Sequence, residues 1–172
     1  MIEFMILALP RCGTTWAANW LTTDTTLCIH DPLFKYHYTE IDNIKSDKIL
    51  GISCTGIHQF PEWVNDHPAR KVILYRDLEE INNSLRKAGL HACTRQQQIR
   101  LSRVKGYRLP WTDLFDNPQG IHEYLLGKPF DSERHAELIN INIQPMLSRL
   151  TIDKQLMTQL VEEMQGATSC HG

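Results

Sequence analysis

The sequence lacks the features that mark membrane, secreted and metal-binding proteins. Within its 172 residues, no apolar run approaches the ~20 residues of a membrane-spanning helix, and no basic signal-peptide region opens the chain. The five cysteines are scattered and form no C-x-x-C pair, which disfavours a disulfide framework. The candidates for metal ligands, His30, His37, His58 and Asp31, lack a helical i, i+4 or C-x-x-C arrangement. We therefore expect a cytoplasmic protein with no metal and no membrane contact.

An excess of charge of either sign is also missing. The net charge is −2, with 42% hydrophobic and 22% charged residues, which is typical of a globular protein. This balance argues against a protein that coats nucleic acid. The chain contains no internal repeat, low-complexity tract or clear linker, so we expect one domain over residues 1–172.

Apolar, β-branched runs alternate with helical patterns in the first half of the chain. This alternation predicts an α/β fold with a three-layer arrangement and a parallel sheet of about four strands. The expected strands cover residues 2–9, 25–29, 48–54 and 71–75, and the expected helices cover residues 14–21, 38–44, 60–65 and 78–87.

The second half has a different pattern, with no convincing strand after Cys93. The expected helices cover residues 94–104, 121–126, 131–140 and 153–164, and a frayed tail is expected over residues 166–172. We therefore divide the domain into an α/β nucleotide-binding part, residues 1–90, and a helical part, residues 91–172.

The turn after the first strand has the composition of a phosphate-binding loop. The apolar run of residues 6–9 stops at a proline, and a cation, a glycine and two threonines precede the next helix. Unpaired N–H groups at a helix start, together with the helix dipole, attract anions. The run reads Pro10-Arg11-Cys12-Gly13-Thr14-Thr15-Trp16.

A second cation follows the strand at residues 71–75. Arg76 ends this strand, and Ser84 lies eight positions later on the next helix. Because ligands bind beyond the carboxyl ends of parallel strands, Arg11 and Arg76 suggest a ligand with more than one phosphate-like group. Structural roles remain open for two of these residues: Trp16 also suits a core position, and Arg76 also suits an ion pair with an acidic neighbour, Asp77 or Glu80.

The loop departs from the nucleoside-triphosphate pattern G-x-x-x-x-G-K-[ST]. No glycine lies five residues before Gly13, and Thr14 stands where the lysine would be. Since that lysine normally reaches the outer phosphates, the sequence disfavours an ATPase or a kinase.

The two motifs together resemble the sulfotransferase family. That family carries a strand followed by P-[KR]-[ST]-G-[ST]-[ST]-W, and here only Cys12, in place of serine, departs from it. The family's second motif is an arginine at a strand end and a serine eight positions later, as at Arg76 and Ser84. The resemblance covers residues 5–86, about half the chain, and is closest to short sulfotransferase-like proteins of phages and bacteria. It implies a P-loop-like fold.

The resemblance also implies a donor, 3′-phosphoadenosine 5′-phosphosulfate (PAPS), which leaves as 3′-phosphoadenosine 5′-phosphate (PAP). Arg11 would neutralise charge on the bridging oxygen as the sulfuryl group leaves. The backbone N–H groups of residues 13–15 would hold the 5′-phosphate, and Trp16 would stack on the adenine. Arg76 and Ser84 would hold the 3′-phosphate.

Transfer to an acceptor needs a general base. Asp31, with His30 beside it, ends the second expected strand in a His30-Asp31-Pro32 context that is similar to the K-E-P-like context of carbohydrate sulfotransferases. His58 follows the third expected strand, where cytosolic sulfotransferases keep a histidine, but the K-T-H context is absent. Asp31 is the preferred candidate. As alternatives, Asp31 suits a turn, and His58 suits an ordinary loop position.

Three functions remain open from the sequence. The first is a small sulfotransferase that acts on a hydroxyl or amine of a small-molecule or glycan acceptor. The second is a binding module that keeps the nucleotide site but has lost transfer, because the C-terminal G-x-x-G-x-x-K loop of cytosolic sulfotransferases is missing. The third is a P-loop kinase of a small metabolite or nucleoside.

Overall fold

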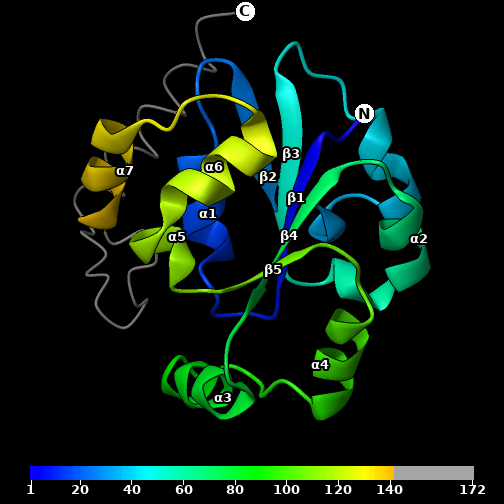
Figure 1. Cartoon of the computed structure of the whole chain (residues 1–172). Helices are drawn as coiled ribbons and strands as arrows, with labels where there is room; N and C mark the ends of the chain where they lie inside the picture. Colours follow the sequence, from blue (N-terminus) through cyan, green and yellow to red (C-terminus); the bar gives the residue numbers. More distant parts are fainter. Residues whose placement is uncertain (142–172) are drawn as a thin grey trace, which may run out of the picture.

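A computed structural model describes residues 1–141 and has an α/β fold built on a five-stranded, all-parallel sheet (Figure 1). The strand order is β2-β3-β1-β4-β5, so the first strand lies in the middle of the sheet. The α/β class and the parallel sheet expected from the sequence are confirmed. The strands are β1 (Phe4–Ala8), β2 (Thr26–His30), β3 (Ile49–Cys54), β4 (Arg70–Tyr75) and β5 (Tyr107–Pro110).

The sheet has one strand more than the four expected, and this strand lies in the half of the chain expected to be helical. β5 pairs in parallel with β4, with Val72 opposite Tyr107 and Leu74 opposite Leu109. Its sequence is short, exposes Tyr107 and Arg108, and ends in a proline. Proline is tolerated at the edge of a sheet, and an edge strand of four residues is too short to show a clear alternating pattern.

Helices cover both faces of the sheet and form the outer layers (Figure 1). On one face lie α1 (Thr14–Trp20), α5 (Asp113–Asp116), α6 (Pro118–Leu126) and α7 (Ser132–Ile139). On the other lie α2 (Pro61–Asp66) and three short 3-10 segments, η1 (Pro32–Phe34), η2 (Tyr38–Asn43) and η3 (Ile57–Gln59).

Two further helices, α3 (Leu78–Lys87) and α4 (Arg95–Ser102), lie beyond the carboxyl ends of the strands, at the bottom of Figure 1. The side chain of Asp77 accepts hydrogen bonds from the backbone N–H groups of Glu79 and Glu80 and so caps α3. The helix expected over residues 153–164 and the tail expected over residues 166–172 lie outside the described residues. Within residues 1–141, no helix is long and apolar enough to cross a membrane.

The core surrounds β1, whose five residues are all buried. A continuous apolar run of this kind is typical of a strand covered on both faces. Close packing also explains one glycine in β3, because a Cβ on Gly51 would lie 2.1 Å from the ring of Phe4. The rigid β1 fixes the position of the turn that follows it.

The strand order creates a crevice beside β1. The chain leaves β1 toward β2, on one side, and leaves β3 toward β4, on the other side. The loops after β1 and β3 therefore diverge, and in parallel sheets ligands bind at such a switch point.

Candidate functional site

The turn between β1 and α1 contains two residues with left-handed backbone conformation. Arg11 has φ 66° and Gly13 has φ 80°. Glycine adopts this region freely, whereas a non-glycine residue there stores about 1–3 kcal/mol of strain. A Cβ on Gly13 would also lie 2.9 Å from Leu114 Cδ1. Both backbone conformation and packing therefore favour glycine at position 13.

The turn brings the two halves of the sequence pattern into contact. Arg11 Nε donates a hydrogen bond to Ser84 Oγ at 3.0 Å. Arg76 Nη1 donates to the backbone carbonyl of Arg11 at 2.8 Å. The carboxyl ends of β1 and β4 and the second turn of α3 thus place two guanidinium groups and a hydroxyl in one cluster, as expected from adjacent strands.

The Arg76 guanidinium has two further partners. Its Nε donates to Glu80 Oε2 at 3.1 Å, and its Cζ lies 4.4 Å from the centre of the Trp111 ring. The structural ion pair left open by the sequence is therefore present. The Glu80 side chain is 59% exposed, and such pairs stabilise a protein by only about 0.3–0.5 kcal/mol. An anion can compete with Glu80 for Arg76, whereas Trp111 holds the guanidinium plane in place.

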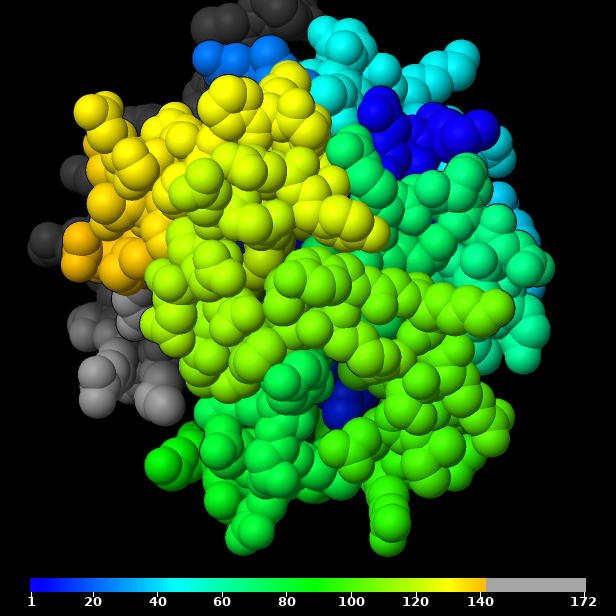
Figure 2. Space-filling model, viewed as in Figure 1, coloured from blue at the N-terminus to red at the C-terminus, as the bar shows by residue number. Residues whose placement is uncertain are grey.

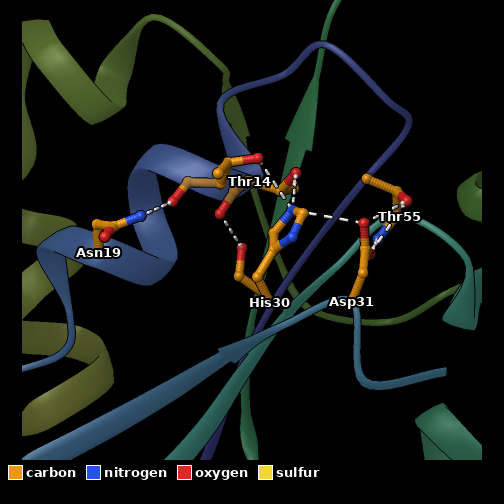
Figure 3. A network of polar contacts seen from close by, with 7 residues as sticks. Thr14, Asn19, His30, Asp31 and Thr55 are labelled. Carbon is orange, nitrogen blue, oxygen red and sulfur yellow. Dashed lines mark hydrogen bonds and ion pairs between the residues drawn. The ribbon is translucent and has the colours of Figure 1, made fainter. Parts of the chain in front are cut away.

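A different network occupies the other side of the turn, toward β2 and β3 (Figure 3). His30 Nε2 lies 3.3 Å from Thr14 Oγ1 and 3.1 Å from Thr15 Oγ1. Asp31 Oδ2 lies 3.4 Å from the same ring nitrogen. The loop threonines that the sequence assigned to phosphate binding are therefore also in contact with a histidine.

The carboxylate of Asp31 is held by the end of β3. The backbone N–H of Thr55 donates to Asp31 Oδ1. The Thr55 hydroxyl lies 3.1 Å from each of the two carboxylate oxygens and donates to them. Asp31 has φ 42°, so its backbone is strained as well. The partnership of Thr55 with Asp31 follows from the parallel pairing of β2 with β3.

A shallow hollow of about 180 Å³ opens beside Asp31. Leu33 and Phe34 from η1, together with Thr55 and Gln59, contribute to its lining. The side chain of Phe34 is 92% exposed, which is unusual for a residue of this size next to a polar site. The hollow adjoins Asp31 and has room for a small group of a second molecule.

His58, one of the three candidates for the base, does not join this network. Its side chain is 2% exposed, and no hydrogen-bond partner for either ring nitrogen is found among residues 1–141. Burial lowers the pKa of this imidazole. η3 packs His58 into the face of the sheet that is opposite α1, so we replace the expected catalytic role with a structural one.

Cys12, the unconventional residue of the turn, faces the interior. It is fully buried, and its Sγ lies 3.8 Å from the carbonyl oxygen of Pro10. Burial raises the pKa of the thiol to about 12, although the nearby Arg76 acts in the opposite direction. The thiol is therefore neutral at physiological pH.

Trp16 also departs from its expected role. It is 8% exposed and packs against Trp20, Phe115 and His135, with ring-centre distances of 5.4, 4.8 and 5.2 Å. Its indole N–H donates to the carbonyl of Leu138 at 3.2 Å. The core role left open by the sequence is the observed one, and in this arrangement the ring offers no free face to an adenine.

Arg108 closes the C-terminal end of α4, where its Nη2 donates to the carbonyls of Leu101 at 3.1 Å and Ser102 at 2.9 Å. Over the part of the chain that the structure describes, no group of three histidine, cysteine or acidic residues could hold a metal ion. The chemistry of the site therefore rests on hydroxyls, guanidinium groups, one histidine and one carboxylate.

No family model matches the sequence, and the search of curated proteins finds no match either.

Proposed function

We propose that the protein is a small sulfotransferase that moves a sulfuryl group from PAPS to a hydroxyl or amine of a small-molecule or glycan acceptor. One observation carries the proposal. Two motifs far apart in the sequence meet, with Arg11 hydrogen-bonded to Ser84 at 3.0 Å and Arg76 to the Arg11 carbonyl at 2.8 Å. A P-loop-like topology, with the phosphate loop after the central strand of the order β2-β3-β1-β4-β5, is part of the proposal.

The described residues suit the two phosphate groups of such a donor. Two guanidinium groups supply positive charge, and charge-assisted hydrogen bonds from arginine to phosphate are among the strong ones. Ser84 Oγ accepts from Arg11, so its own hydrogen can be donated to a phosphate oxygen. The buried Trp16 does not stack on the adenine in this arrangement. The hydrogen bond between Arg76 and Glu80 would have to break when Arg76 binds a phosphate.

Each side of the turn would have its own task in transfer. PAPS supplies the sulfuryl group: the bond between sulfur and the bridging oxygen breaks, and a bond from the acceptor oxygen or nitrogen to sulfur forms. Arg11 balances the negative charge that develops on the departing 5′-phosphate. The acceptor proton passes to His30 Nε2, and Asp31, 3.4 Å away, stabilises the resulting imidazolium. We therefore move the base from Asp31, the residue preferred from the sequence, to its neighbour His30.

The acceptor would enter through the hollow beside Asp31 and Phe34, because this space is lined by Asp31, the residue next to the proposed base. The four described cysteines are free thiols and buried, which agrees with the cytoplasmic location that the proposal includes.

Nucleotide binding tests the proposal directly. We expect PAP to raise the melting temperature of the wild-type protein and to bind with micromolar affinity or better in calorimetry. Arg76→Ala should weaken binding by about 10- to 100-fold, because a hydrogen bond to a charged group contributes about 1.5–3 kcal/mol. Arg86→Ala removes an equal charge from an exposed position on the same helix and should leave the affinity unchanged. The absence of PAP binding, or equal binding by both variants, would refute the proposal.

Two further assays on the same protein test the two alternative functions that the sequence leaves open. Transfer of radiolabelled sulfate from PAPS to any member of an acceptor panel would exclude a binding module without activity. Magnesium-dependent ATP binding that PAP does not compete with would instead favour a kinase.

A further inference from the structure

A cavity of about 380 Å³ lies between the carboxyl ends of β1 and β4 and the helices α3 and α4. Figure 2 shows it as a hollow between the segments of these two helices, with the blue of the chain after β1 visible at its floor. Its floor is apolar and includes Leu9, Leu74, Ile81 and Leu101, all of which are buried. Its volume lies in the range of small-molecule sites, roughly 300–1,000 Å³.

The rim of this cavity is polar and positively charged. Three arginines line it, Arg76, Arg95 and Arg108, and no carboxylate does. The guanidinium of Arg108 is fixed by its bonds to the end of α4, and Gln98 adds an exposed amide. The cavity thus combines apolar and guanidinium surfaces with groups, such as the Gln98 amide, that can both donate and accept hydrogen bonds.

The cavity is continuous with the proposed phosphate site. Arg76 belongs to both, and Ile81 in the cavity floor lies three residues before Ser84 on α3. A group attached to a phosphate on Arg76 and Ser84 can therefore reach the cavity. At the same time, the burial of Trp16 removes the stacking partner that the sequence offered for the donor's base.

On the premise of the proposed function, we infer that this cavity holds the purine base of the donor nucleotide. Flat bases stack on guanidinium planes and on apolar side chains, and a glutamine amide pairs with the donor and acceptor edge of adenine. Ile81 and Leu101 supply the apolar contact, and Gln98 supplies the polar edge. The base of PAPS then lies on the α4 side of Arg76, not on Trp16.

Filling the cavity tests the inference on the full chain. Ser102 lines the rim and is exposed, so Ser102→Trp adds bulk without disturbing the core. Gln96→Trp is the matched control, because Gln96 is exposed on the same helix but does not line the cavity.

Calorimetry would measure the affinity of each protein for PAP and for the abasic deoxyribose 3,5-bisphosphate, which keeps both phosphates and lacks the base. A melting curve without ligand checks that each variant folds, and Ile99→Trp on the same rim replaces Ser102→Trp if it does not.

We expect Ser102→Trp to weaken PAP binding at least tenfold and to leave the affinity for the abasic compound unchanged. Gln96→Trp should leave the affinity for both compounds unchanged. Unchanged PAP binding, or an equal loss for both compounds, would overturn the base site and leave the proposed function standing. If the wild-type protein bound neither compound, the proposed function would fail and the base site with it. A second readout is base preference: Gln98→Leu should lower the preference for PAP over the guanosine analogue.

Discussion

The two sides of the β1–α1 turn differ in the kind of polar group that they present. Toward β4, Arg11 and Arg76 carry fixed charges that no accessible pH removes, and a single hydroxyl, Ser84, joins them. Toward β2, neutral threonine hydroxyls surround the titratable pair His30 and Asp31. Fixed charge is suited to holding an anion, whereas groups that gain and lose protons are suited to the chemical step. Under the proposed function, anion binding and proton transfer would lie on opposite sides of one turn.

The strongest test of this separation is His30→Ala. Loss of a general base lowers rates by about 10²–10⁴, so we expect kcat for sulfuryl transfer to fall at least about 100-fold. The affinity for PAP should change little, because His30 itself makes none of the proposed phosphate contacts. Radiolabel transfer with an active acceptor measures the first quantity, and calorimetry measures the second.

Two variants control this experiment. His91→Ala removes an exposed histidine outside both networks and should preserve kcat. Asp31→Asn keeps an oxygen for Thr55 but not the charge beside His30, so we expect a smaller loss of kcat, about tenfold. A larger loss in Asp31→Asn than in His30→Ala would return the role of base to Asp31.

The sequence revealed one side of the turn far better than the other, for a physical reason. Arg11, Arg76 and Ser84 belong to two local patterns, each complete within ten residues, and a parallel sheet brings the ends of such patterns together. The contact between Asp31 and Thr55 depends on the pairing of β2 with β3, which no local pattern encodes. No local pattern decides between the alternatives left open for Trp16 and His58 either, since their burial depends on α5, α7 and η3, which pack from elsewhere in the chain.

His58→Leu should change the pH dependence of stability without affecting transfer. Burial lowers the pKa of His58 in the folded protein, so the unfolded chain binds a proton that the folded chain does not. The resulting stability is fully present above the unfolded pKa of about 6.5 and is lost as the pH falls below it, at up to about 1.4 kcal/mol per pH unit. We expect the variant to lose less of its free energy of unfolding between about pH 7.5 and pH 5, as measured by urea denaturation.

His91→Leu provides the comparison for this measurement, because His91 is exposed. If both variants had the same pH profile as the wild-type protein, His58 would not be held neutral by burial. A collapse of kcat in His58→Leu at unchanged stability would restore His58 as a candidate base.

Ser84→Ala tests the fixed-charge side on a smaller scale. The serine hydroxyl supplies one hydrogen bond to the proposed 3′-phosphate, and a typical net value of about 0.5–1.5 kcal/mol corresponds to a roughly two- to tenfold weaker PAP affinity. The variant should retain the kcat of the wild-type protein at saturating donor. Ser132→Ala serves as the control, because Ser132 is exposed at the start of α7 and lines neither proposed site. A kcat effect without an affinity effect would contradict the separation of the two sides.

Cys12→Ser should have the smallest effect, although it restores the residue usual in the sulfotransferase motif. The thiol is buried, faces the Pro10 carbonyl and is neutral, because burial raises its pKa to about 12. A serine hydroxyl in the same orientation donates to that carbonyl and reaches no phosphate, so we expect the PAP affinity in calorimetry to stay within about twofold of the wild-type value. An affinity gain of tenfold would mean that the side chain at position 12 turns toward the anion. Unchanged affinity would instead assign anion binding in this turn to the backbone N–H groups and to Arg11, because none of these groups is altered when the thiol becomes a hydroxyl.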